Sequence, residues 1–200
     1  MIVDGELLQH EVAQNRSLAW NEYNAVANAK TGTLFGWCTG TGAWLAGSPH
    51  FEAAKQFGNT LGYAFQMADD LIDTFEIDAA TASDSDLISW IDTAPPLPLV
   101  LAAQNNPSVN EWWKAAKLAH TREEQIALVQ KLQDAAKNPL VVAESLKRVD
   151  EALDKATQYL ATLGLENDMS WTVETIAERA RQGAELSQTL GIEKKHHGLA

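Results

Sequence analysis

The sequence has few of the features found in secreted or membrane-spanning proteins. It contains one cysteine, Cys38, so no disulfide can form within the chain, which fits a reducing compartment. It shows no charged-then-apolar leader and no apolar run long enough to cross a bilayer. We therefore expect a cytoplasmic protein without a membrane span.

Positive charge is also scarce. The 200 residues include 15 lysines and arginines against 27 aspartates and glutamates, which gives a formal net charge of −12. Nucleic acids and anionic membrane surfaces repel such a chain, so we expect no nucleic-acid role. Hydrophobic residues make up 46% of the sequence, enough to bury one sizeable core. We expect a single domain over residues 1–200.

The alternating polar and apolar runs typical of strands are nearly absent, and apolar residues recur at helical spacing along most of the chain. This pattern predicts an all-α helical bundle. The stretch 78–94 shows no such periodicity and is predicted to be a mobile loop. The predicted helices cover approximately residues 2–14, 19–46, 50–76, 97–104, 109–119, 122–136, 140–163 and 170–190.

An acidic cluster inside the predicted helix 50–76 is the most informative feature. Asp69, Asp70 and Asp73 stand at positions i, i+1 and i+4, so Asp69 and Asp73 lie one turn apart on one helix face. Three carboxylates this close repel one another, and a cation should compensate them. Mg²⁺ is the candidate because it takes carboxylate oxygens and bridges to phosphates. A solvated acidic face is the alternative, but apolar residues surround the acids: Phe65, Met67, Leu71, Ile72 and Phe75.

Five short segments precede or adjoin these acids in a fixed order. They occupy residues 5–9 (Gly-Glu-Leu-Leu-Gln), 23–31, 45–47, 57–58 and 61–66. Their order and spacing resemble the trans-isoprenyl diphosphate synthases, especially the long-chain polyprenyl type, and the resemblance is clear from about residue 5 to residue 75. It implies an isoprenoid synthase-like helical domain with prenyltransferase-type chemistry.

The resemblance also implies roles for individual residues. The three aspartates match the family's second aspartate-rich motif, which binds Mg²⁺ and the diphosphate of the substrates. By the same correspondence Lys30 would contact diphosphate, and Thr31 and Gln66 would line the reacting centre. The expected cofactor is Mg²⁺ and the expected ligand is a prenyl diphosphate.

Two departures from the family pattern remove parts of the expected site. Family members carry a first aspartate-rich motif and an arginine pair on helices before the Gly-Glu-x-x-Gln segment, whereas Met1 lies only four residues before Gly5. We therefore expect a bundle that lacks its N-terminal helices and the allylic half of the active site. In the segment 92–99, Ala94 stands where the family has a phosphate-binding lysine, and the stretch 78–86 lacks the usual basic residue.

These departures leave three hypotheses open. The chain is part of an active prenyltransferase, completed by a separate N-terminal-half polypeptide or by a longer native protein. Alternatively, it is a non-catalytic subunit that modulates a complete synthase, which Ala94 favours, or only a module that binds metal or diphosphate. In each case we expect no chain elongation by the isolated chain. We also expect a homo-oligomer or a complementary subunit to cover apolar surface on helices 2–14 and 19–46.

Two further features have predicted structural roles. Trp37 and Trp44 are predicted to fill the core beside the glycines of the helix 19–46. The basic stretch 194–197 is predicted to be a frayed tail, with a metal or phosphate contact as the alternative.

Overall fold

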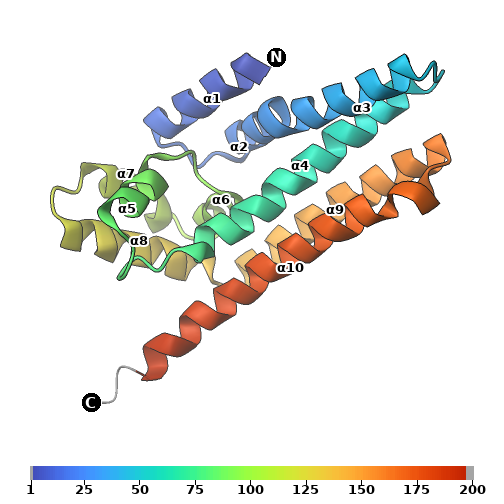
Figure 1. Ribbon diagram of the computed structural model, residues 1–200. Coiled ribbons are helices and arrows are strands. Elements are labelled where there is room, and N and C mark those ends of the chain that lie inside the picture. The colour runs from blue at the N-terminus through green and yellow to red at the C-terminus, as the bar shows by residue number, and fades with distance from the viewer. Residues whose placement is uncertain (1, 197–200) are drawn as a thin grey trace.

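The computed structural model describes the backbone of residues 2–196 and the side chains of residues 3–189. Within that part of the chain every regular element is helical, which confirms the all-α prediction (Figure 1). In chain order the elements are α1 Ile2–Asn15, α2 Trp20–Ala27, the π-helical turn η1 Asn28–Gly32, α3 Thr33–Leu45, α4 Phe51–Glu76, α5 Asp84–Asp92, α6 Leu97–Asn105, α7 Ser108–Leu118, α8 Arg122–Ala136, α9 Pro139–Leu163 and α10 Glu166–His196.

Helix α4 is the central element of the fold. It runs antiparallel to α3 on one side and packs against the α9–α10 hairpin on the other, while α5 to α8 gather around its C-terminal end (Figure 1). Its fully buried side chains recur at helical spacing: Phe57, Leu61, Ala64, Met67, Ala68, Leu71 and Phe75. A helix that is apolar over this much of its surface is stabilised by burial among neighbours.

Glycines allow the neighbours of α4 to approach closely at two positions. A Cβ atom added to Gly62 would lie 2.7 Å from the carbonyl oxygen of Thr31, so η1 rests directly on α4. A Cβ atom added to Gly183 of α10 would lie 2.7 Å from Leu71 Cβ, beside the acidic turns of α4. Real side chains would not fit at either contact, so these glycines set the distances between the helices.

The end of α1 is anchored by a buried arginine. Arg16 has a left-handed φ of 53° and lies with its guanidinium 3.5 Å from the ring centroid of Trp113. Its Nε donates to the carbonyl oxygen of Trp113 at 3.1 Å, and a second nitrogen donates to the carbonyl of Ile91. The arginine thereby ties α1 to α5 and α7 and closes one end of the molecule.

The prediction of a loop over residues 78–94 is wrong for residues 84–92, because these residues form α5. Ser83 caps this helix by accepting a hydrogen bond from the Asp86 N–H, and Leu87, Trp90 and Ile91 bury its apolar side. The helix is only nine residues long and opens with serine and aspartate, which also characterise loops. The segment therefore contains too few apolar residues for a helical periodicity to be recognised in the sequence.

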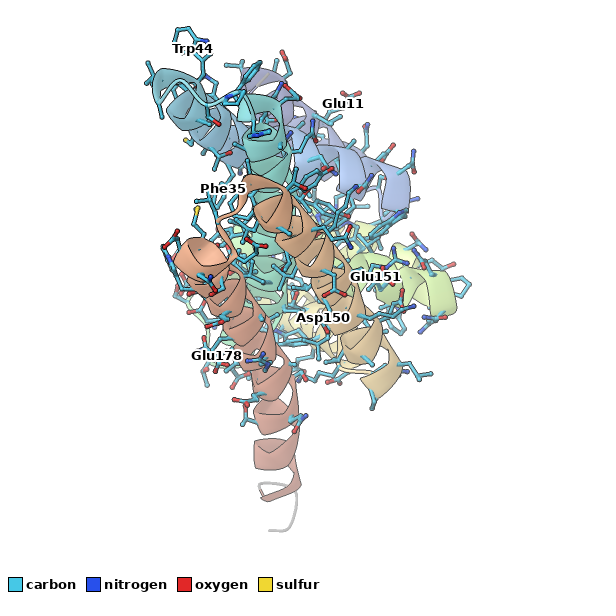
Figure 2. The ribbon with its side chains drawn as sticks, turned by 90° about the vertical axis from the view of Figure 1, so that its right-hand side faces the viewer. Glu11, Phe35, Trp44, Asp150, Glu151 and Glu178 are labelled. Atoms are coloured by element: carbon cyan, nitrogen blue, oxygen red, sulfur yellow. The ribbon has the colours of Figure 1, made fainter. Side chains whose placement is uncertain are left out.

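The core positions predicted for Trp37 and Trp44 are also wrong. Their exposed fractions are 59% and 62%, and Trp44 stands out from the upper end of the molecule in Figure 2. The glycine face of α3, formed by Gly36 and Gly40, packs against α4 around Lys55. Because successive helical residues are rotated by about 100°, Trp37 falls outside that contact.

The predicted continuous helix 19–46 is divided into α2, η1 and α3, with the π-helical turn at Asn28–Gly32. No helix in the described residues is both long and apolar enough to cross a membrane. The side chains of residues 194–197, predicted to form a frayed tail, lie outside those that the structure describes.

Candidate functional site

A cavity of about 390 Å³ lies beside the acidic turns of α4, between α1, α2, η1 and residues 93–96. The hydroxyl of Thr31 donates to Gln66 Oε1 at 2.6 Å and so braces one wall of this cavity. A larger groove of about 650 Å³ between α2, α4 and α9 contains none of the predicted site residues. Of the six residues predicted as functional, five line the smaller cavity: Lys30, Gln66, Asp69, Asp70 and Asp73.

Asp70 is the buried member of the acidic cluster, with an exposed fraction of 7%. Its Oδ2 accepts hydrogen bonds from the Tyr23 hydroxyl at 2.6 Å and the Leu97 N–H at 3.0 Å, and its Oδ1 accepts one from Gln66 Nε2 at 2.9 Å. Burial raises the pKa of Asp70 to about 7, although these hydrogen bonds act in the opposite direction. Asp70 therefore joins α2 and the start of α6 to α4.

Asp69 faces α10 and forms an ion pair with Arg179 across 110 residues of sequence. Arg179 Nε donates to Asp69 Oδ1 at 2.8 Å, and a second guanidinium nitrogen contacts the same oxygen. The guanidinium carbon also lies 5.6 Å from the ring centroid of Phe65, one turn before Asp69 on α4. The charge pattern predicted a compensating cation here, and the structure supplies an arginine that the sequence analysis did not identify.

Asp73 lies one turn beyond Asp69 and is exposed. Its pKa is raised to about 6, mainly because the carboxyl group is partly withdrawn from water and also because Asp69 and Glu76 are negatively charged, while the charge of Arg179 acts in the opposite direction. Negative charge on this face of α4 is thus only partly compensated by the described residues.

Lys30 projects from η1 towards α1. Its Nζ donates to Gln9 Oε1 at 2.6 Å and lies 3.4 Å from Glu6 Oε1. Gly5 makes this contact possible, because a Cβ atom there would lie 2.7 Å from the backbone nitrogen of Lys30. The Gly-Glu-Leu-Leu-Gln segment and the Lys-Thr pair, far apart in sequence, therefore meet at the cavity.

Residues 93–96 form the rim of the cavity on the chain segment before α6, and Ala94 stands there in place of the expected lysine. Among the described residues that line the cavity, Lys30 alone carries a positive charge. The rim is held in place by the hydrogen bond from the Leu97 N–H to Asp70. The positions that match the family pattern are therefore assembled, but one of the expected phosphate-binding charges is missing.

Two of the three carboxylates of the acidic cluster suit a magnesium ion. Residues 3–189 contain no group of three or more acidic, histidine or cysteine side chains arranged to enclose a metal. Mg²⁺ in phosphate-binding sites is usually held by one or two carboxylates together with phosphate oxygens and water. Asp69 and Asp73, which share a face of α4, suit that mode, whereas both oxygens of Asp70 are engaged by protein donors.

Residues 1–135 match the family model described as Polyprenyl synthetase. An all-trans-nonaprenyl-diphosphate synthase (geranyl-diphosphate specific) of Rhodobacter capsulatus is 33% identical over 105 residues, which are 52% of this chain and 32% of that protein. A farnesyl diphosphate synthase of Bacillus subtilis is 34% identical over 74 residues, 36% of this chain and 25% of that protein.

Solved structures show the same fold. A decaprenyl diphosphate synthase from Rhodobacter capsulatus superposes with a TM-score of 0.62 at 23% identity, covering 92% of this chain and 55% of that one. A geranylgeranyl pyrophosphate synthase from Bacteroides thetaiotaomicron gives a TM-score of 0.65 at 21% identity, covering 92% and 59%. The chain thus spans little more than half the length of these structural relatives.

Proposed function

Because the chain belongs to the polyprenyl synthetase family, we propose that it acts in isoprenoid biosynthesis as a prenyltransferase-type protein that binds a prenyl diphosphate at the α4 cavity. One observation carries this proposal. Five residues that match family motifs, separated by up to 43 positions from Lys30 to Asp73, line a single cavity. The cytoplasm is the proposed compartment.

In this proposal the residues have distinct tasks. Asp69 and Asp73 would hold Mg²⁺, and Lys30 would donate directly to the diphosphate. When held there, Mg²⁺ would supply positive charge against the negative charge that develops on the diphosphate leaving group. Thr31 and Gln66 form a polar wall at the reacting centre, where the Thr31–Gln66–Asp70 hydrogen bonds fix their orientations.

Chain elongation requires, in this proposal, a complementary N-terminal-half polypeptide or a longer native chain that brings the first aspartate-rich motif. The alignments with solved structures span 92% of this chain but little more than half of each relative. Apolar side chains that such a partner would cover are exposed on both α1 and α3: Val3, Leu7, Leu34, Trp37, Trp44 and Leu45. Self-association would cover part of the same surface.

A non-catalytic role, as a subunit that modulates a complete synthase, is the second candidate. The observation that favours it is the shortage of positive charge at the cavity, where Ala94 stands in the rim and Lys30 is the lining cation among described residues. A catalytic site has to stabilise the charge of the leaving diphosphate, whereas a binding subunit need only hold it.

Turnover assays separate these functions. We expect no elongation when the purified chain is mixed with allylic and homoallylic diphosphates, and elongation when a polypeptide carrying the N-terminal half of a family member is added. Turnover by the chain alone would contradict the need for a partner. Two results together would favour the regulatory subunit. The mixture with the N-terminal-half polypeptide would stay inactive, and the rate of a complete synthase would change when this chain is added.

A further inference from the structure

Arg179 lies on the face of α10 that meets α4, one turn before Gly183. Gly183 brings α10 into contact with the backbone of α4 at Leu71 and Ile72. Arg179 precedes Gly183 by four residues and therefore lies on the same face of α10, where it reaches Asp69. Figure 2 labels Glu178, its neighbour on this turn of α10.

The contact is formed by more than a single hydrogen bond. Two guanidinium nitrogens meet Asp69 Oδ1, and the guanidinium faces Phe65, which itself stacks on Phe35 with 5.7 Å between ring centroids. The side chains of Arg179 and Asp69 are 39% and 27% exposed. A planar guanidinium held by a carboxylate and an aromatic ring loses little freedom on forming such a pair.

The same carboxylate is the one that the proposed function assigns to a metal ion. The two guanidinium nitrogens occupy the lone pairs of Asp69 Oδ1, so a divalent cation that approaches this carboxylate meets one engaged oxygen and the repulsion of a positive charge. Among the described residues no other cation contacts the three aspartates of α4.

We propose that Arg179 competes with the divalent cation for Asp69, so that α10 keeps the acidic cluster closed until metal and diphosphate bind together. This inference rests on the proposed assignment of Asp69 as a metal ligand. A metal ion alone must displace the guanidinium without help, whereas a metal–diphosphate complex adds contacts to Lys30 and provides phosphate oxygens to which the released guanidinium can donate.

The direct test measures metal binding without diphosphate. Mn²⁺ is a suitable probe because it takes carboxylate ligands as Mg²⁺ does and is detected by electron paramagnetic resonance. We expect Arg179→Gln in the full chain to bind Mn²⁺ about fivefold to tenfold more tightly than the wild type, the range expected for release of a partly exposed, charge-assisted pair. Thermal melting checks that the variant is folded.

Two controls separate competition at Asp69 from a general change in charge. Arg181→Gln removes the same charge two residues away, where Arg181 pairs with Glu178 at the surface, and should leave Mn²⁺ affinity within about twofold of the wild type. Arg179→Gln combined with Asp69→Asn should lose the gain. Arg179→Lys, which keeps the charge without the planar fork, should give an intermediate affinity.

Each outcome decides the inference. Equal Mn²⁺ affinity in wild type and Arg179→Gln, or no detectable binding in either, overturns it, because removal of the competitor should reveal the acidic pair. A gain in Arg181→Gln as large as in Arg179→Gln also overturns it. A gain specific to Arg179→Gln supports it, even when neither protein binds pyrophosphate. In that last case the proposed function fails while the competition at Asp69 stands.

Discussion

The Tyr23 hydroxyl donates to Asp70 Oδ2 over 2.6 Å, and both residues are buried. This bond connects α2 to α4 across 47 residues of sequence, and both residues line the cavity. It also fixes the direction of Asp70, which then accepts the backbone N–H at the start of α6. The pair is therefore a structural joint between three helices and lies at the wall of the proposed diphosphate site.

Removing the hydroxyl tests that joint. Tyr23→Phe deletes one of three donors to a buried carboxyl group, so we expect the free energy of unfolding to fall by about 1–3 kcal/mol. Urea denaturation followed by circular dichroism measures the change. The matched control is Tyr159→Phe, a partly buried tyrosine on α9, which should cost less than about 0.5 kcal/mol. Equal losses in the two variants would contradict the proposed joint.

Asp70 should also shape the pH dependence of stability. Its pKa is raised from 3.8 to about 7, so the folded chain holds a proton here that the unfolded chain has released between those two values. Stability from this group is therefore greatest at low pH and declines as pH rises from about 4 to about 7. We expect Asp70→Asn to flatten the decline in unfolding free energy, measured by urea titration at several pH values. Parallel curves for both proteins would refute this assignment.

Restoring the missing charge at the rim should strengthen ligand binding. Ala94 is half-buried in the cavity wall, at the position where the family pattern has a lysine. We expect Ala94→Lys to bind pyrophosphate with Mg²⁺ about tenfold to a hundredfold more tightly, because a charge-assisted contact contributes about 1.5–3 kcal/mol. Ala80→Lys adds the same charge on an exposed residue outside the cavity. If calorimetry finds the same gain in affinity for both variants, the gain comes from the change in net charge and not from a contact at the rim.

The apolar face of α3 should govern association of the isolated chain. Trp37 and Trp44 lie on that face with Leu34 and Leu45, all exposed. Patches of this kind are rarely tolerated on monomers. We expect the wild-type chain to associate as its concentration rises, and Trp37→Gln with Trp44→Gln to reduce association without lowering helicity. Light scattering that finds a stable monomer of wild type at all concentrations would contradict this expectation.

Five of the six residues predicted from the sequence line one cavity, because their order along the chain matches a family pattern that places them on η1 and α4. Thr31 is not among the lining residues, although it donates a hydrogen bond to Gln66. The sequence did not reveal the different roles of the three acids. Asp70 follows Asp69 by one residue, yet a rotation of about 100° turns it into the interior, and only packing against Tyr23 shows this.

Long-range contacts account for the rest of what was missed. Arg179 lies 110 residues from Asp69, and nothing in its local sequence marks it as the partner. The exposure of Trp37 depends on which face of α3 meets α4. The glycine pattern alone does not determine that face, which the contacts of Gly36 and Gly40 with Lys55 and Asn59 of α4 reveal. Helix α5 is too short for its period to be distinguished from a loop.

Calorimetric titration of pyrophosphate into the chain, with and without Mg²⁺, measures whether the acidic turns of α4 form a diphosphate site. We expect binding by the wild type only when Mg²⁺ is present, no measurable binding by Asp69→Ala, and binding weakened by about tenfold or more in Asp73→Ala. Glu178→Ala, which removes a carboxylate on the surface of α10 outside the cavity, should leave the affinity unchanged. Wild-type affinity in both aspartate variants would show that the diphosphate does not bind at these turns.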